Sequence, residues 1–162
     1  MDKQRIPQTR STTMESRFVP VREISPRAFI DTAGVELHRA ERYRVFVSLS
    51  VIDLDFVRSL AGDKFDEAKQ RMVKAVRESI RACDSVALVG EHCLSVLFPE
   101  TSRQGAEIAI RRLSDLVRSE LSSLVGREVK DVVPVEMASY PDTAGAKALS
   151  VFLTELADKN RN

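Results

Sequence analysis

The chain has 162 residues, a length that suits one domain of ordinary size. Its composition is that of a soluble globular protein, with 43% hydrophobic and 30% charged residues, and a formal net charge of only +1 gives no sign of a polyanionic partner such as nucleic acid. The longest strongly apolar run, VFVSLSVI at 45–52, is too short to cross a bilayer, and residues 1–17 lack the apolar region of a secretory signal. We therefore expect a cytoplasmic protein without a membrane segment.

The N-terminal part of the chain differs from the rest. Residues 1–26 are polar, carry Pro7, Pro20 and Pro26, and show no sustained hydrophobic period. We interpret these residues as a flexible arm, which leaves 27–162 as the folded domain. The chain contains no internal repeat and no low-complexity segment.

The first half of the domain predicts two helices with a buried strand between them. Apolar residues recur at every third or fourth position over 26–43, which indicates a helix with a proline in its first turn. The next segment, 44–55, is apolar at nearly every position, as in a strand covered on both faces, and it ends in Asp53 and Asp55. After a short helical or irregular stretch, the pattern predicts an amphipathic helix over 63–82.

A hairpin is predicted next, with apolar strands at 84–89 and 93–99. A tight two-residue turn would place Val89 opposite His92. In that register the two cysteines of the chain lie several residues apart along the strands, which is too far for a disulfide. We therefore expect both thiols to be reduced and at least partly buried.

The last part of the chain predicts a long helix, a strand and a closing helix. Ser102 suits the N-cap of the long helix, which stops near Gly126. Residues 128–141 read as a strand, in which Pro134 cannot donate a ladder hydrogen bond and so indicates an edge position or a bulge. Apolar residues spaced over 149–156 predict the closing helix.

The predicted order is helix, strand, helix, strand, strand, helix, strand, helix. Long helical connections place the strands that they join in parallel, and one hairpin lies between them. This order predicts an α+β fold of the ferredoxin-like type, in which helices pack around a central mixed sheet of about five strands.

Several segments resemble the GGDEF family, the diguanylate cyclase domains that join two GTP molecules into cyclic di-GMP. HRAERYRVFVSLSVIDLDFVRSL (38–60) is similar to the family's entry from a helix into a strand and an Asp-x-Asp, and DSVALVGEHCLSVLFPET (84–101) resembles its catalytic hairpin. ASYP (138–141) and NRN (160–162) resemble the family's A-x-Y-P and G-R-N. The resemblance covers most of 27–162 and implies the nucleotide-cyclase form of the fold.

The catalytic turn departs from the family's sequence. Its five positions are Gly90, Glu91, His92, Cys93 and Leu94, so only the first glycine of the GGDEF turn is kept. His and Cys are poor substitutes for the carboxylates that hold Mg²⁺ beside a triphosphate, and the second residue adds a negative charge where phosphate would approach. We interpret the domain as catalytically inactive, with no resident metal or cofactor.

Two other interpretations concern the same region. His92 and Cys93 could form a soft metal site, which is disfavoured because adjacent strand positions point to opposite faces of a sheet. Binding of GTP without turnover, or residual cyclase activity, would rest on Asp53, Asp55 and Arg161, where the resemblance places polar groups of the family's site.

A ligand site is implied next to the turn. Residues 81–84 read Arg-Ala-Cys-Asp, and family members often carry a product-binding inhibitory site, R-x-x-D, at this distance before the turn. Arg112 matches a second arginine of that site. An arginine fork can hold a guanine edge or a phosphate, and a carboxylate accepts from guanine N1 and N2. The resemblance thus implies a cyclic di-GMP site of Arg81, Asp84 and Arg112. The structural alternative is that Arg81 caps its helix and Asp84 pairs with a nearby base.

The sequence therefore predicts an inactive GGDEF-like domain that senses cyclic di-GMP and passes the signal to an unidentified protein partner. Sites of this kind often bind a stacked pair of ligands between two protomers, so a ligand-bridged homodimer is a second expectation. The main alternative is an interaction or scaffold module that binds no nucleotide. None of these interpretations involves nucleic acid or membrane insertion.

Overall fold

One antiparallel sheet forms the centre of the molecule. The structure, a computed structural model, describes residues 24–161, so the arm predicted at 1–26 lies almost entirely outside the described residues. The sheet has the strand order β2-β3-β1-β4. Its strands are β1 (Val47–Asp53), β2 (Ser85–Val89), β3 (Cys93–Pro99) and β4 (Val135–Tyr140).

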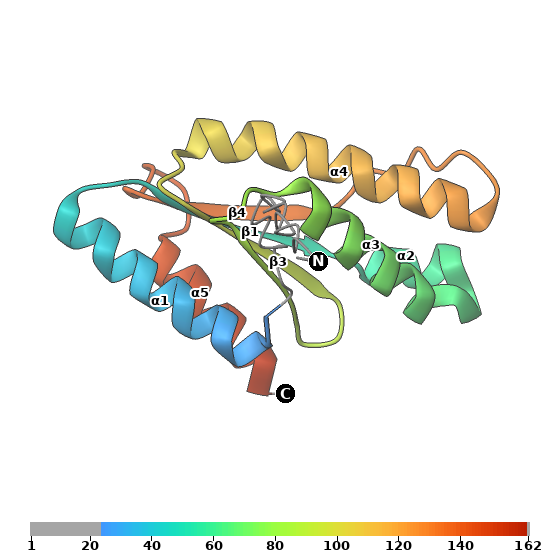
Figure 1. Cartoon of the computed structure of the whole chain (residues 1–162), viewed down its shortest axis with the longest axis horizontal. Coiled ribbons are helices and arrows are strands. Elements are labelled where there is room, and N and C mark those ends of the chain that lie inside the picture. The colour runs from blue at the N-terminus through green and yellow to red at the C-terminus, as the bar shows by residue number, and fades with distance from the viewer. Residues whose placement is uncertain (1–23, 162) are drawn as a thin grey trace, which may run out of the picture.

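Helices cover both faces of this sheet, as Figure 1 shows. The helices are α1 (Pro26–Tyr43), α2 (Asp55–Ala61), α3 (Phe65–Ser79), α4 (Arg103–Val125) and α5 (Leu149–Arg161), with a single 3-10 turn at 62–64. α1 and α5 pack on one face, and α2, α3 and α4 pack on the other. None of the helices in the described part of the chain is long and apolar enough to span a membrane.

The α+β fold and the order of elements are confirmed, but two details of the predicted sheet are wrong. Over the described residues 24–161 the sheet has four strands, slightly fewer than the expected number of about five, and it is not mixed, because its three neighbouring pairs are all antiparallel. The strands joined by helical connections, β1 to β2 and β3 to β4, do run parallel, but another strand lies between each such pair. The hairpin inserted between the two helical connections causes this arrangement.

The strand predicted at 128–141 is shorter than expected. Regular pairing with β1 begins at Val135, directly after Pro134, and residues 128–134 have no regular secondary structure. Proline has no N–H to continue a ladder, which explains why regular pairing stops there. Among the strands of the described residues, β4 has a neighbour on one side only, in agreement with the predicted edge position.

The hairpin turn contains three residues, not two. Val89 pairs with Cys93 rather than with His92, so the loop consists of Gly90, Glu91 and His92. Gly90 takes a φ of +65°, a left-handed conformation that residues with a side chain rarely adopt. This shift of one residue moves His92 into the turn and brings Cys93, which was expected in the strand, opposite Val89, where its side chain packs in the core.

The two cysteines lie in different environments. Both are free, as predicted, and Cys93 is buried. The expectation of partial burial is wrong for Cys83, which is exposed because it lies in the turn that precedes β2 rather than in the strand.

Side chains cap both of the long helices that flank the sheet. Ser25 accepts a hydrogen bond from the N–H of Ala28 at the start of α1, and Ser102 accepts from the N–H of Gly105 at the start of α4. Gly126, at φ +73°, ends α4 in the left-handed conformation that favours glycine. These caps account for the confirmed helix limits at 26–43 and near Gly126.

The sheet separates two hydrophobic cores. The core under α3 and α4 includes Met72, Val76, Val96, Leu113 and Leu121. The core under α1 and α5 includes Phe29, Leu37, Leu49, Ala138 and Phe152. β1 contributes to both, and all its residues except Asp53 are buried, which confirms the prediction of a strand covered on both faces.

Candidate functional site

The R-x-x-D residues form a tight turn between α3 and β2. The N–H of Asp84 donates to the carbonyl of Arg81 at 3.0 Å, which closes a four-residue turn. In return, Asp84 Oδ2 accepts from the N–H of Arg81 at 2.9 Å. The predicted helix over 63–82 therefore stops early, at Ser79, because the carboxylate of Asp84 binds a backbone donor that would otherwise belong to the helix.

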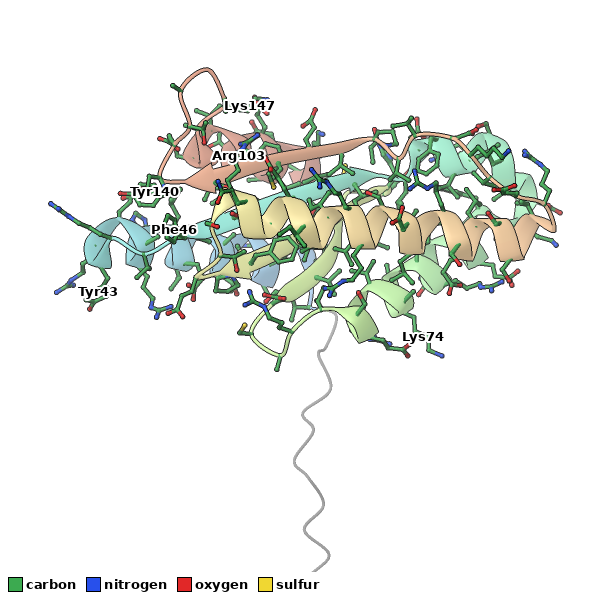
Figure 2. All side chains as sticks on the ribbon, turned by 90° about the horizontal axis from the view of Figure 1, so that it is seen from above. Tyr43, Phe46, Lys74, Arg103, Tyr140 and Lys147 are labelled. Atoms are coloured by element: carbon green, nitrogen blue, oxygen red, sulfur yellow. The ribbon has the colours of Figure 1, made fainter. Side chains whose placement is uncertain are left out.

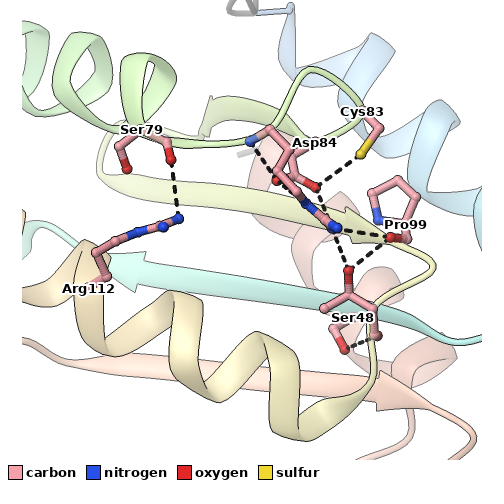
Figure 3. Close-up of polar contacts among 8 residues, drawn as sticks. Ser48, Ser79, Cys83, Asp84, Pro99 and Arg112 are labelled. Carbon is pink, nitrogen blue, oxygen red and sulfur yellow. Dashed lines mark hydrogen bonds and ion pairs between the residues drawn. The ribbon is translucent and has the colours of Figure 1, made fainter.

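The guanidinium of Arg81 lies across the same carboxylate. Its Nε and Nη2 donate to the two oxygens of Asp84 at 3.3 and 3.1 Å, and Nη2 also donates to Thr101 Oγ1 at 2.6 Å. These contacts are drawn in Figure 3. The hydrogen bond to Asp84 raises the already high pKa of Arg81, so this side chain stays charged. The arginine is 57% exposed, whereas the carboxylate side chain is only 3% exposed.

The side chain of Asp84 is therefore buried and not at the surface. Its oxygens are occupied by the backbone and side chain of Arg81, and Cys83 Sγ lies 3.8 Å from Oδ1. The structural alternative predicts that Asp84 pairs with a nearby basic residue. The turn contains such a pair, and the basic residue is Arg81. In this geometry Asp84 fixes the direction of the exposed guanidinium.

Arg112 reaches the same corner from α4. Its Nη2 donates to the carbonyl of Ser79, the last residue of α3, at 3.2 Å. Figure 3 shows this side chain crossing from α4 toward the end of α3, next to the turn that holds Asp84. A cation at this position suits the negative end of the helix dipole. The helix is thus capped by Arg112, not by Arg81 as the structural alternative supposed.

A second feature is a pocket beside the hairpin turn. It has a volume of about 480 Å³, within the range of small-ligand sites. The lining residues are Val89, Gly90, Glu91, His92, Cys93, Lys159 and Asn160. α5 thus contributes Lys159, which no sequence pattern marked as a site residue. Arg161 was marked by the resemblance, but its Nη1 lies 3.9 Å from Asp158 Oδ1 and it does not line the pocket. The helix predicted over 149–156 stops short of Lys159, so no pattern in the sequence marked this lysine, which lies in the last turn of α5.

Comparisons with known proteins identify the fold. No family model matches the sequence, and no curated protein matches it. Among solved structures, the diguanylate cyclase SiaD from Pseudomonas aeruginosa, solved with its activator SiaC, matches with a TM-score of 0.62 at 22% identity. That match covers 85% of this chain and 55% of the SiaD chain, so this chain spans about half of that protein's length.

Two further structures agree. A diguanylate cyclase protein from Thermotoga maritima matches with a TM-score of 0.59 at 12% identity, over 86% of this chain and 96% of that one. The GGDEF domain of DgcB from Caulobacter crescentus, in complex with c-di-GMP, matches with a TM-score of 0.54 at 19% identity, over 87% and 85% of the two chains. The chain has a GGDEF-like fold. The fold implied by the sequence resemblance is thereby confirmed.

In this GGDEF-like domain the two acids at the end of β1 and the start of α2 make local contacts. Asp53 Oδ1 accepts from the N–H of Asp55 at 2.9 Å, and the carboxylate of Asp55 lies 3.1 Å from Arg58 Nε. His92 Nε2 is 3.9 Å from Asp53 Oδ1. Within the described residues no three His, Cys, Asp or Glu side chains are placed to hold a metal ion.

In the hairpin turn the side chains of His92 and Cys93 lie in different environments. Cys93 packs in the core under α1 and α5, while the ring of His92 belongs to the turn. Burial raises the pKa of the Cys93 thiol, which opposes the thiolate that a soft metal requires. His92 Nδ1 is buried without a hydrogen-bond partner among the described residues. The arrangement therefore gives no support to a shared metal site of these two residues.

Proposed function

We propose that this GGDEF-like domain is a catalytically inactive receptor for cyclic di-GMP in the cytoplasm, which binds the ligand through Arg81, Asp84 and Arg112 and passes the signal to a protein partner. The observation that carries the proposal is the convergence of two guanidinium groups, one from the turn before β2 and one from α4, on a single exposed corner. Among the solved structures with this fold, one is a complex with c-di-GMP and another is a complex with an activator protein.

The chemistry of the corner suits a cyclic dinucleotide. The Nε and Nη2 of Arg81 bond Asp84 and Thr101, so its Nη1 is the group that would donate to a phosphate or to guanine O6, whereas Arg112 can offer a guanidinium fork. Asp84 holds Arg81 in a fixed direction through two side-chain hydrogen bonds, so less conformational freedom is lost when a ligand binds. Arg112 needs to release only one carbonyl contact, to Ser79, before it can bind an anion.

The proposal of catalytic inactivity is supported by the turn. Phosphoryl transfer depends on Mg²⁺ held by oxygen ligands beside the triphosphate. The turn supplies a glutamate, a histidine and a buried cysteine in place of the family's glycine and acids, and Asp53 already accepts a backbone hydrogen bond. The 480 Å³ pocket beside the turn does contain Lys159, so GTP binding without turnover is tested together with the receptor function.

Calorimetric titration of the purified chain with cyclic di-GMP tests the receptor function. We expect micromolar or tighter binding, about −8 kcal/mol or better, and no binding of GTP. Arg112→Ala should weaken binding at least tenfold without disturbing the fold. Arg127→Ala, which removes an exposed arginine beyond the end of α4, is the matched control and should bind as the wild type does.

Arg81 needs a more careful substitution. Arg81→Ala would leave the buried carboxylate of Asp84 without its partner and would destabilise the fold. Arg81→Lys keeps the charge but loses the guanidinium donors, so a loss of affinity with an unchanged melting temperature would assign the guanidinium group to the ligand. Absence of heat at high ligand concentration with the wild type would refute the receptor function and leave the nucleotide-independent interaction module.

Two simple measurements complete the test. Incubation with labelled GTP and Mg²⁺ should yield no cyclic di-GMP, and the appearance of product would refute inactivity. Gel filtration with and without ligand should show a shift to a dimer if a stacked ligand pair bridges two protomers. An unchanged elution volume at saturating ligand would exclude that bridge while leaving the binding result intact.

A further inference from the structure

Strand β4 presents one row of backbone groups to the outside of the sheet. The N–H of Asp53 donates to the carbonyl of Pro134 at 3.1 Å, and the backbone groups of every second residue from there bond to β1. The groups of Val135, Met137 and Ser139 therefore point away from β1. Within the described residues, no hydrogen bond outside the ladder uses them. An edge of this kind can accept another strand.

A groove runs beside this edge, between β4 and α4. Its volume is about 290 Å³. The floor is apolar, with Ile110 from α4 and Val135 and Met137 from β4, and the wall is charged, with Arg103, Glu107 and Arg111 from α4. Side chains of a strand added to β4 alternate between the two faces of the sheet, so every second one would enter this groove.

One hydrogen-bond donor in the wall of the groove has no acceptor among the described residues. Arg103 Nε pairs with Glu107 at 3.2 Å, but Arg103 Nη1 is buried with no hydrogen-bond partner among the described residues. Arg111 is exposed, so the wall carries an excess of positive charge. Figure 2 shows Arg103 in the first turn of α4, next to β4 and near Tyr140. A carboxylate in the groove would satisfy the buried donor with a charge-assisted hydrogen bond.

The chain itself is a poor occupant for this groove. Residues 1–23 carry more basic than acidic side chains, and the described chain begins at Ile24, whose N–H donates to Val86 on β2, at the opposite edge of the sheet. A second copy paired through β4 would bring the arginines of both α4 helices together. The groove therefore suits an acidic segment from another protein.

We propose that β4 and its groove bind an extended acidic segment of a partner protein, which adds a fifth strand to the sheet. This proposal rests on one part of the proposed function, that the domain binds a protein partner, and does not depend on the cyclic di-GMP site. Arg103 and Arg111 are eight residues apart on α4, which is about 12 Å along a helix and close to the length of four residues in a strand. The geometry thus fits an acidic residue, an apolar residue two places on, and a second acidic residue two places further.

A matched pair of capped peptides tests this pattern without cyclic di-GMP present. The first is Thr-Glu-Thr-Val-Thr-Glu-Thr, and the second carries Lys in place of both Glu. In ¹⁵N-resolved spectra of the full chain, we expect the Glu peptide to shift the amides of Val135, Met137 and Ser139 and to slow their hydrogen exchange. Equal binding of the two peptides, or shifts confined to other surfaces, would overturn the proposal.

Charge reversal in the groove supplies the decisive comparison. Arg103→Glu combined with Arg111→Glu should weaken the Glu peptide about tenfold, as expected for the loss of two partly exposed ion pairs, and should favour the Lys peptide. Lys64→Glu combined with Lys74→Glu makes the same change in net charge elsewhere, and Figure 2 places Lys74 on α3, away from the groove. The control should keep the wild-type preference, and a loss of preference there would show that net charge alone selects the peptide.

The backbone contribution is tested separately. Met137→Pro removes an N–H that points away from β1, so it should abolish peptide binding while the circular dichroism spectrum stays native. Arg112→Ala should leave peptide binding unchanged, so failure here and failure of the cyclic di-GMP site are distinguishable. If a short oligothymidine shifted the same amides more strongly than the Glu peptide, the groove would be an anion site for nucleic acid and the proposal would be wrong.

Discussion

At the scale of single residues, the environment decides what each ionisable group can do. Cys93 and Cys83 have the same chemistry, but the first lies in the core under α1 and α5, and the second lies in an exposed turn. Burial raises the pKa of Cys93 above its ordinary value of 9.0, because the charged thiolate is poorly solvated there. The folded protein therefore keeps this proton to a higher pH than the unfolded chain does.

This difference predicts how stability depends on pH. The contribution of Cys93 is fully present below pH 9.0 and is lost as the pH rises through the raised folded-state pKa, because the unfolded chain then binds fewer protons. Denaturant unfolding from neutral pH upward should show a smaller alkaline loss of stability in Cys93→Ala than in Cys83→Ala. A thiol reagent should modify Cys83 rapidly and Cys93 only on unfolding. Rapid reaction of both thiols in the native protein would contradict the burial.

At the scale of elements, the ends of the helices depend on contacts of different range. The N-cap at Ser102 and the left-handed Gly126 lie next to the helix that they limit, so the sequence predicts both ends of α4. α3 ends earlier than its apolar pattern suggests, because Asp84 captures the N–H of Arg81. Periodicity does not contain that information, and it also does not distinguish a two-residue hairpin turn from the observed three-residue turn at 90–92.

The cap of α4 gives a direct test. Ser102→Ala removes the hydroxyl that accepts from the N–H of Gly105, and should lower the free energy of unfolding by about 1 kcal/mol. Ser114→Ala, in the middle of the same helix, is the matched control and should be neutral or slightly stabilising, since alanine has the higher helix propensity. Chemical denaturation measures both, and equal effects would mean that the cap contributes nothing.

At the scale of the whole molecule, the sequence predicts the fold class and the order of elements, because both follow from hydrophobic periods and breakers. The resemblance to the GGDEF family marked Arg81 and Arg112, and both side chains lie by the end of α3, where Arg81 bonds Asp84 and Arg112 bonds the carbonyl of Ser79. The burial of Asp84 and the place of Lys159 beside the hairpin turn depend on how distant segments pack, and no local pattern encodes them. The four strands placed along the sequence are all found in the described residues, and only the expected total of about five differs slightly.

The two cores on one sheet predict cooperative unfolding. Phe29→Ala in the core under α1, and Leu121→Ala in the core under α4, should each lower stability by about 2–5 kcal/mol, because both side chains are fully buried. Each variant should still unfold in a single transition, because β1 belongs to both cores. Val35→Ala, at an exposed position of α1, should have little effect. Separate transitions in circular dichroism would show that the faces unfold independently.

The strand order also determines which strand pairs of the sheet can form first during folding. β2 and β3 are separated by a turn of only three residues, so they can pair early. β1 pairs with β4, and the partners Val47 and Tyr140 lie far apart in the sequence. Long loops are slow to close and gain nothing until they do, so the β1–β4 ladder is expected to assemble late and to open first. The edge that offers a row of unpaired backbone groups is thus also the part of the sheet held by the most distant contacts. A partner strand bound at this edge would therefore hold the β1–β4 ladder closed and so stabilise the folded protein.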